Sequence, residues 1–330
     1  MDRRQFLVTG STATGALVLL GPGCVSSDKT DTGSAVNEKA PMGSIFEISL
    51  AQYSLHRAYR DGIRDPMNFA ADARGEFGIG AIEYLSRDMR GREREPDYLA
   101  ELKSRADGEG VRGLLIMVDG EGNLGSSDPG VRRSAVENHF KWVQAAKFLS
   151  CHSIRVNAMI NADSLAYDEQ LKLSADGLRQ LVEFAAGLEL NVIVENHGGL
   201  SSSGEWLSGL MEMVDHPRCG TLPDFGNFCI EGSAYPVDGC NVMYDYYRGV
   251  EELMPYAKAV SAKSYDFDEA GNETTLDYER LMRIVLDAGY RGYVGIEYEG
   301  SVLSEDDGIR ATRDLLLAVR ETLTTEYKET

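Results

Sequence analysis

The sequence is poor in the residues from which metal clusters and disulfide-rich folds are built. Only five of its 330 residues are cysteines and only five are histidines. No two cysteines have CxxC spacing, and none of the spacings is typical of a zinc knuckle. Three of them, Cys219, Cys229 and Cys240, lie close enough in sequence for one disulfide in an exported protein, although we favour unpaired thiols there. The remaining two cysteines are Cys24 and Cys151.

Basic residues are also scarce. The chain has 33 lysines and arginines against 53 aspartates and glutamates, which gives a net charge of −20. Such a charge repels phosphates and argues against a nucleic-acid partner. The hydrophobic share of 43% and the charged share of 26% are ordinary for a globular protein. The length suits one large domain or two small ones.

Long hydrophobic runs are absent near the N-terminus. The mildly apolar stretch from Leu7 to Leu20 is too short to span a bilayer. It follows Arg3-Arg4 and a Phe-Leu pair, which is typical of a twin-arginine (Tat) export signal. The segment Gly-Pro-Gly-Cys that ends at Cys24 resembles a bacterial lipobox, although glycine stands where an aliphatic residue is preferred.

These features predict a three-part chain. We expect a Tat-type signal peptide with a lipobox over residues 1–24, a flexible tether over 25–43 and a folded domain over 44–330. The protein is then periplasmic or a membrane-anchored lipoprotein, with a lipid on Cys24 as its membrane attachment. Because phosphorylated small molecules are scarce outside the cytoplasm, this location also favours an unphosphorylated small-molecule partner.

From residue 44 onward, strand-like apolar runs alternate with amphipathic helical stretches. The helical stretches with an apolar stripe of period near 3.6 include 138–149, 174–188 and 278–288. The strand-like runs are 46–53, 81–85, 114–118, 153–156, 191–194, 220–222, 259–262 and 293–296. About eight alternations predict a single-domain α/β fold, a (β/α)8 TIM barrel. An open doubly wound sheet is less favoured because no GxGxxG follows the first strand.

The run 191–194 ends in a cluster of polar residues, Glu195, Asn196 and His197. Side chains alternate along a strand, so Glu195 and His197 point the same way. A carboxylate beside an imidazole at the carboxyl end of a strand suits metal binding or proton transfer. The alternative is a surface loop with incidental charges, and recurrence of the pattern at other strand ends argues against it.

In a barrel, the carboxyl ends of all strands meet at one face, where active sites lie. Three carboxylates at the ends of the fifth, sixth and eighth strands, Glu195, Asp224 and Glu297, would repel one another there, and a divalent cation would remove the repulsion. Oxygen ligands favour Mn²⁺ or Mg²⁺, with Zn²⁺ or Co²⁺ as alternatives. Further polar residues expected at this face are His56, Glu83, Asn157, His197, Asn227 and Lys263.

These strand ends resemble the xylose isomerase-like barrel superfamily, and within it the sugar phosphate isomerase/epimerase group. The resemblance rests on Glu195-Asn196-His197, Asp224-x-x-Asn227 and Gly-Ile-Glu297, and it covers about residues 45–325. It implies one divalent metal held by Glu195, Asp224 and Glu297. The family's seventh-strand histidine is missing, because Ser261 stands in that position, while Lys263 of the same pattern is retained.

The resemblance also implies a reaction. A metal that chelates a substrate carbonyl acidifies the neighbouring C–H, so an isomerase or epimerase working through an enediolate-type intermediate is expected. Glu195 and Glu297 would transfer the proton. The substrate-binding residues would be His56, Glu83, Asn157, His197, Asn227 and Lys263.

Two other functions remain open at this point. A lyase or dehydratase on a keto-sugar or glycoside would use the same metal and base, and a non-catalytic sugar-binding barrel would fit the missing histidine. An endonuclease IV-like role is disfavoured because its zinc cluster needs more histidines than this face offers. The oligomeric state, the metal and the sugar are not determined by the sequence.

Overall fold

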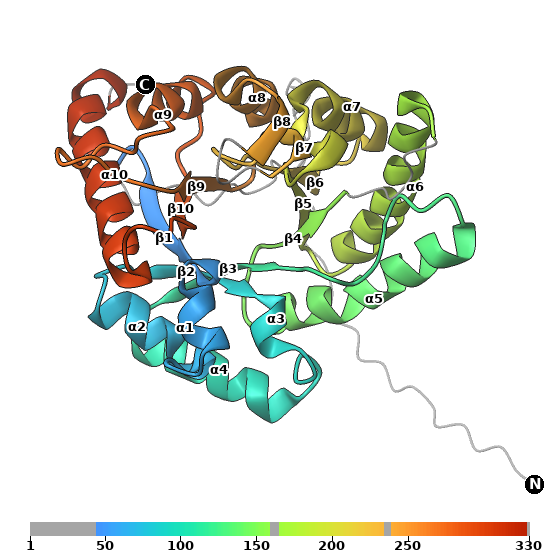
Figure 1. The fold of residues 1–330 in the computed structure, drawn as a ribbon. Helices are drawn as coiled ribbons and strands as arrows, with labels where there is room; N and C mark the ends of the chain where they lie inside the picture. Colours follow the sequence, from blue (N-terminus) through green and yellow to red (C-terminus); the bar gives the residue numbers. More distant parts are fainter. Residues whose placement is uncertain (1–43, 159–164, 234–238, 329–330) are drawn as a thin grey trace, which may run out of the picture. The chain divides into compact units, whose positions relative to one another are not determined.

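The computed structural model describes residues 44–158, 165–233 and 239–328. Within these ranges eight parallel strands form one sheet in the order β6-β5-β4-β3-β2-β1-β10-β9. Each predicted strand-like run corresponds to one of them. The strands are β1 (Glu47–Ala51), β2 (Ala81–Leu85), β3 (Arg112–Met117), β4 (Ser153–Asn157), β5 (Asn191–Glu195), β6 (Cys219–Leu222), β9 (Val260–Ser264) and β10 (Tyr293–Tyr298). Strands β1 and β10, far apart in sequence, lie side by side (Figure 1).

The ring closes between β6 and β9 through two isolated parallel bridges, Thr221 to Ala257 and Asp224 to Ser261. The amide of Lys258 donates to the carbonyl oxygen of Thr221 at 3.0 Å, and the amide of Phe225 donates to that of Ser261 at 3.0 Å. We call this joint the β6–β9 seam. The predicted single-domain (β/α)8 barrel is therefore confirmed.

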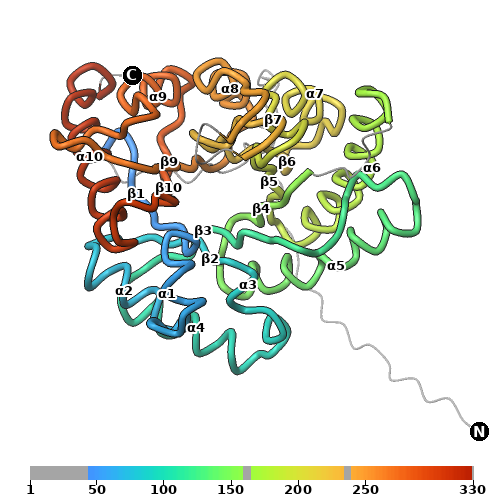
Figure 2. Tube along the Cα trace, viewed as in Figure 1, coloured from blue at the N-terminus to red at the C-terminus, as the bar shows by residue number. Residues whose placement is uncertain are grey.

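Helices cover the outside of the ring, and the chain winds around it once from β1 to α10 (Figure 2). The helices are α1 (His56–Arg60), α2 (Phe69–Gly75), α3 (Ser86–Met89), α4 (Pro96–Gly108), α5 (Pro129–Phe148), α6 (Tyr167–Ala186), α7 (Gly204–Val214), α8 (Tyr246–Leu253), α9 (Tyr278–Asp287) and α10 (Glu305–Tyr327). Short 3-10 turns are η1 (Gln52–Leu55), η2 (Pro66–Asn68), η3 (Gly199–Ser202) and η5 (Met254–Tyr256). The three predicted helical stretches correspond to α5, α6 and α9, which end one or two residues earlier than predicted. Helix α5 begins earlier than its apolar stripe because the Asp128 side chain accepts hydrogen bonds from two amides of its first turn, and proline stands at N1.

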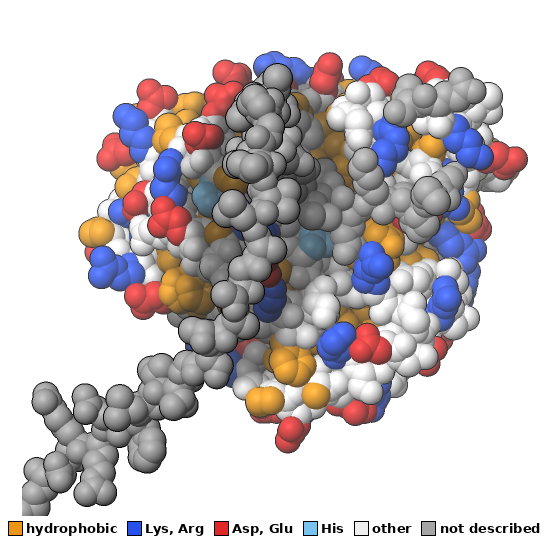
Figure 3. Space-filling view, turned by 180° about the vertical axis from the view of Figure 1, so that it is seen from behind, with side chains coloured by type: hydrophobic (Ala, Val, Ile, Leu, Met, Phe, Trp, Pro, Cys, Tyr) orange, Lys and Arg blue, Asp and Glu red, His pale blue; other side chains and the backbone are white. Residues whose placement is uncertain are grey.

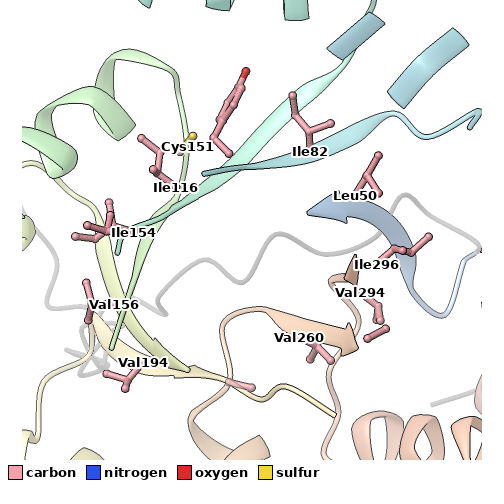
Figure 4. Packing of buried hydrophobic residues seen from close by; sticks show 14 of the residues in the cluster. Leu50, Ile82, Ile116, Cys151, Ile154, Val156, Val194, Val260, Val294 and Ile296 are labelled. Atoms are coloured by element: carbon pink, nitrogen blue, oxygen red, sulfur yellow. The ribbon is translucent and has the colours of Figure 1, made fainter. Parts of the chain in front are cut away.

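The strand side chains divide into two layers because they alternate along each strand. Outward-facing residues such as Ile82, Ile116 and Ile154 belong to the large apolar cluster shared with the helices (Figure 4). The apolar cluster on the inward face is small and consists of Ala51, Leu85, Leu115, Met117, Ile193, Leu222 and Ala259. Much of the remaining interior is polar and buried, which is costly unless the polar groups are paired.

A two-stranded hairpin follows β6, and the sequence patterns did not predict it. Strand β7 (Cys229–Gly232) pairs antiparallel with β8 (Cys240–Met243). A disulfide joins Cys229 to Cys240, whereas Cys219 is a free thiol. The expectation of three unpaired cysteines was therefore wrong for two of them.

The predicted signal peptide, lipobox and tether lie outside the described residues. Among the helices that the structure describes, none has the length and apolar character that crossing a membrane requires. Acidic and basic side chains are interspersed over the face of the molecule in Figure 3, so the negative charge is not gathered into one patch on the visible part of that face.

Candidate active site

Three buried carboxylates from three strands converge inside the barrel. Glu195 is the last residue of β5, Asp224 follows β6, and Glu297 lies near the end of β10. One oxygen from each carboxylate lies within 4.8 Å of the others. This is the set that the sequence analysis predicted as metal ligands, and we call it the carboxylate triad. In the described part of the chain, the three residues form a group that could hold a metal ion.

Asp224 is held by the turn that follows β6. Its Oδ1 accepts hydrogen bonds from the amides of Gly226 and Asn227, both at 2.8 Å. The side chain of Asn196 holds the backbone at the same place, because its Oδ1 accepts from the Asp224 amide and its Nδ2 donates to the Asp224 carbonyl oxygen. With Oδ1 committed to the turn, Oδ2 of Asp224 faces the seam and Ser261.

Glu195 lies between an amide and a guanidinium. Asn227 Nδ2 donates to Glu195 Oε1 at 2.9 Å. Arg155 Nε lies 2.7 Å from Glu195 Oε2, an ion pair in which the hydrogen-bond angle is poor. Arg155 also pairs with Asp119 at 2.7 Å, and Asn157 Nδ2 donates to the same oxygen of Asp119 at 2.9 Å.

Glu297 and Asp224 share two partners on β9. The hydroxyl of Ser261 lies 2.8 Å from Asp224 Oδ2 and 3.0 Å from Glu297 Oε2. Lys263 Nζ lies 3.7 Å from Asp224 Oδ2 and 3.3 Å from Glu297 Oε1. It also lies 3.1 Å from Oε1 of Glu299. The register explains this arrangement, since Lys263 is opposite Glu297 and Ser261 is bridged to Asp224.

The charges of the centre are not balanced. The triad carries three negative charges when ionised, and Arg155 and Lys263 supply two positive ones, each of which has a further carboxylate partner. Burial raises the pKa of Glu195 to about 7 against the opposing effect of Arg155, and burial raises the pKa of Asp224 to about 7 against that of Lys263. Burial also acts on Glu297, but Lys263 and Arg155 outweigh it and lower the pKa. Ser261 has one proton for two carboxylate oxygens. The excess of negative charge and the single proton of Ser261 both fit a centre that takes up a further cation.

The donor set fits a divalent metal ion. Three carboxylates from separate strands offer hard oxygen ligands of the kind that Mg²⁺ and Mn²⁺ bind. Ser261 lies where the resemblance implies a fourth ligand, and its contacts are with two triad oxygens. The residues that would hold the ion are thus Glu195, Asp224 and Glu297.

The other predicted site residues lie at different depths. His197 is exposed after β5, and its pKa is lowered by the surrounding protein atoms and by the charges of Arg155 and Lys263. His56 begins α1, with Nδ1 2.8 Å from the Tyr53 carbonyl oxygen and its ring stacked on Tyr53. Asn157 and Asn227 contact the centre through Asp119 and Glu195 respectively.

Glu83 lies deeper, in the barrel interior. Its Oε1 accepts from Ser49 Oγ at 2.7 Å, and Gly295 leaves room for the carboxyl because a Cβ there would overlap it. Burial raises the pKa of Glu83 to about 7. In the described contacts Glu83 does not touch the carboxylate triad.

Three residues of the centre had no role assigned to them from the sequence. Asp119 follows β3, and it could have been found by reading that strand end like the others. Arg155 precedes Asn157 by two positions and therefore faces the same side of β4. Glu299 follows β10 and has no sequence signal beyond its position.

Comparison with known proteins gives a family match. The family model described as xylose isomerase-like TIM barrel matches residues 71–319. Two curated relatives match short segments. They are the C-glycoside deglycosidase alpha subunit of Arthrobacter globiformis, 43% identical over 54 residues, and the 3'-dehydrocarminate deglycosidase alpha subunit of a Microbacterium species, 42% identical over 48 residues. The segments cover 16% and 14% of this chain, and 15% and 14% of those relatives.

Solved structures match over most of the chain at low sequence identity, which shows a shared fold. A 3-keto-D-glucoside 4-epimerase of E. coli is 14% identical with a TM-score of 0.60, covering 83% of this chain and 99% of that one. A D-psicose 3-epimerase of Clostridium cellulolyticum, solved with D-tagatose, is 15% identical with a TM-score of 0.62 and covers 83% and 99%. The IOLI protein, solved with a bound zinc atom, is 11% identical with a TM-score of 0.64 and covers 84% and 98%.

Proposed function

Because the chain belongs to the xylose isomerase-like TIM barrel family, we propose that it is a metal-dependent isomerase or epimerase of a sugar or keto-sugar. The observation that carries the proposal is the carboxylate triad, whose oxygens lie within 4.8 Å of one another inside the barrel. The neighbours of similar fold whose names are sugar epimerases agree with it. The reaction is the removal and return of a proton on a carbon beside a carbonyl group.

The metal we propose is Mn²⁺ or Mg²⁺, with Zn²⁺ or Co²⁺ as alternatives, held by Glu195, Asp224 and Glu297. When bound, such an ion stabilises the negative charge that develops on a substrate oxygen. The bound zinc in a protein of similar fold supports a metal at this kind of centre.

Glu195 and Glu297 are the residues that we propose for proton transfer. Two strands, β6 and β9, separate β5 from β10 around the ring, so the two carboxylates reach the centre from different sides. Asn227 and Arg155 hold Glu195, while Ser261 and Lys263 hold Glu297. Each carboxylate therefore has a fixed position, which a proton transfer to a bound substrate needs.

The remaining predicted residues would bind the substrate. His197 and His56 lie after β5 and β1, at the carboxyl ends of those strands, where side chains can reach a bound sugar. We assign them, with Asn157 and Asn227, to hydrogen bonds with substrate oxygens, whereas the ammonium of Lys263 is engaged with three carboxylates. Glu83, deeper in the barrel, would support the substrate-binding layer through Ser49.

A lyase is the second candidate. The two relatives with 43% and 42% identical segments are named as deglycosidase subunits, and one of the names contains 3'-dehydrocarminate. A keto-glucoside epimerase is among the proteins of similar fold. Two of these names, 3'-dehydrocarminate deglycosidase and 3-keto-D-glucoside 4-epimerase, denote an oxidised sugar, so an unphosphorylated keto-glycoside is the substrate class that we propose for either reaction.

The test uses Glu195→Gln and Glu297→Gln, because glutamine keeps size and a ligating oxygen but loses the basic site. Purified variants loaded with Mn²⁺ are incubated in D₂O with a panel of ketoses and keto-glycosides, and deuterium uptake beside the carbonyl is followed by NMR. We expect wild type to exchange and both variants to lose exchange. The matched control, Glu205→Gln, changes an exposed glutamate of α7 and should exchange like wild type.

The outcomes separate the candidates. Loss of exchange in both variants supports the epimerase. Retained exchange with no product in one variant supports the lyase, in which one base acts and another group expels the leaving group. Exchange at the wild-type rate in both variants would show that neither glutamate is the base.

A further inference from the structure

The ammonium group of Lys263 lies inside the centre rather than beside it. Lys263 is 1% exposed, and three carboxylates lie within 3.7 Å of its Nζ. Two of them, Asp224 and Glu297, belong to the carboxylate triad. The third, Glu299, is outside the triad, and its side chain is 26% exposed.

The lysine has little freedom to leave. A Cβ at position 226 would come within 2.9 Å of the Lys263 Cγ, so Gly226 lets the lysine stem pass close to the turn that holds Asp224. The backbone of Lys263 is fixed by β9 and by the Tyr278 hydroxyl, which donates to its carbonyl oxygen at 2.8 Å. The positive charge therefore stays near the triad.

We propose that Lys263 is a resident cation of the centre, which shares Asp224 and Glu297 with the divalent metal ion and competes with it for their charge. Like charges at close range in a buried site repel strongly, so the ammonium lowers the affinity of the triad for the ion. Glu299 is the partner that keeps the ammonium paired when Asp224 and Glu297 are engaged by the metal. The inference rests on the metal site of the proposed function.

Glu299 can pair with Lys263 without occupying a carboxylate of the triad. Its carboxylate is the nearest of the three to Lys263 Nζ, at 3.1 Å, and it is not within the group that could hold the metal. Its partial exposure lets water share in stabilising the pair. When the metal engages Asp224 and Glu297, the lysine stays in place and keeps Glu299 as its partner, so it does not become a buried unpaired charge, which would be expensive.

The test measures Mn²⁺ affinity by isothermal titration calorimetry on the metal-free protein at one pH and ionic strength. Lys263→Met keeps the length of the side chain and removes the charge, and we expect Mn²⁺ to bind about tenfold more tightly. Glu299→Gln removes the alternative partner, and we expect weaker binding than in wild type. Asp224→Ala removes a ligand and serves as the negative control, with binding lost.

The double variant separates competition from a general effect of charge. If Glu299 acts through Lys263, then Glu299→Gln should change the Mn²⁺ affinity much less when Lys263 is already methionine. Purely additive effects of the two substitutions would overturn the inference. So would a Lys263→Met protein that is folded by circular dichroism and binds Mn²⁺ no more tightly than wild type.

The failures of the two proposals are distinguishable. If wild type does not bind Mn²⁺ but Lys263→Met does, the resident cation is supported and metal dependence of the native protein is contradicted. If neither binds any divalent ion, both fail. If Lys263→Met does not fold, Glu299→Gln at its partly exposed position decides, and unchanged affinity there overturns the inference.

Discussion

Glu83 is a buried carboxyl whose surroundings favour its neutral form. It is 1% exposed, its hydrogen bond comes from Ser49, and Glu195 and Glu297 add negative potential. Burial is the largest cause of its raised pKa, which is about 7 in the folded protein. In the unfolded chain an exposed glutamate titrates near 4.3, so this one residue makes the stability of the barrel depend on pH.

We predict that Glu83→Gln stabilises the protein at alkaline pH. The stabilisation that comes from the protonated Glu83 is fully present below the pKa of the unfolded chain. It is lost as pH rises through about 7, because the buried carboxyl then carries a charge. At pH 8.5 the difference should approach roughly 3–4 kcal/mol in the free energy of unfolding and shrink toward zero near pH 4.5. Urea unfolding at several pH values measures it.

The control is Glu183→Gln on the exposed face of α6, which should show no such alkaline gain. If Glu83→Gln were less stable than wild type at pH 8.5, the carboxylate would have to be ionised and favourably paired in the fold. The assignment of a neutral interior carboxyl would then be wrong.

At the scale of elements, the β7–β8 hairpin supports one wall of the centre. Cys229 begins the hairpin two residues after Asn227, whose side chain holds Glu195. The carbonyl oxygen of Asn227 also accepts from Ser202 Oγ in η3, the turn that follows His197. The hairpin, η3 and the turn that follows β6 are therefore linked to one another through Asn227.

We predict that Cys240→Ser, or reduction of wild type, raises KM more than it changes kcat. Without the Cys229–Cys240 bond the hairpin is tethered less firmly, and the segment that carries Asn227, a proposed substrate-binding residue, becomes more mobile, while Glu195 and Glu297 stay on β5 and β10. Steady-state kinetics and Mn²⁺ titration of the same samples measure both parts. Cys219→Ser, which removes a free thiol of β6, is the matched control. Equal KM values in oxidised and reduced protein would contradict this role.

The barrel and the triad followed from sequence because both depend on short-range patterns. Alternating strand and helix periods predicted the strands, and parallel strands place their ends on one face, which brought Glu195, Asp224 and Glu297 together. The hairpin was missed because its two four-residue strands are mostly exposed and carry no apolar alternation.

The contacts of Ser261 and Lys263 needed the structure. They depend on how β9 aligns with the turn after β6 and with β10, and register between distant segments leaves no local signal. The same holds for Arg155, whose pairing with Glu195 follows from neighbouring strands rather than from spacing along the chain.

At the scale of the whole molecule, we propose that the chain is exported by the Tat route and acts in the periplasm or as an anchored lipoprotein. The support is the twin-arginine start at Arg3-Arg4 and Cys24, which the sequence provides, together with the Cys229–Cys240 disulfide. A disulfide of this kind persists in oxidising compartments.

Replacing Arg3 and Arg4 by lysine should therefore retain the protein in the cytoplasm, as measured by cell fractionation and immunoblotting. Thiol labelling of the retained protein should detect Cys229 and Cys240 as free. Cys24→Ala, in turn, should move the exported protein from the membrane to the soluble periplasmic fraction. Export of the twin-lysine variant at the wild-type level would show that the signal is of another kind.

The β6–β9 seam makes the carboxylate triad depend on a joint with few hydrogen bonds. The other neighbouring strands are joined by ladders of two or more residue pairs, whereas this joint has two isolated bridges, and one of them is Asp224 to Ser261. Parting of β6 from β9 is a local opening that leaves the helices and the other ladders intact. We expect such a fluctuation to separate Asp224 from Glu297 and to stop the proposed activity before the protein unfolds globally. The rate at which the proposed activity is lost on warming should then depend on this joint, and a ligand that contacts both of its sides should slow the loss.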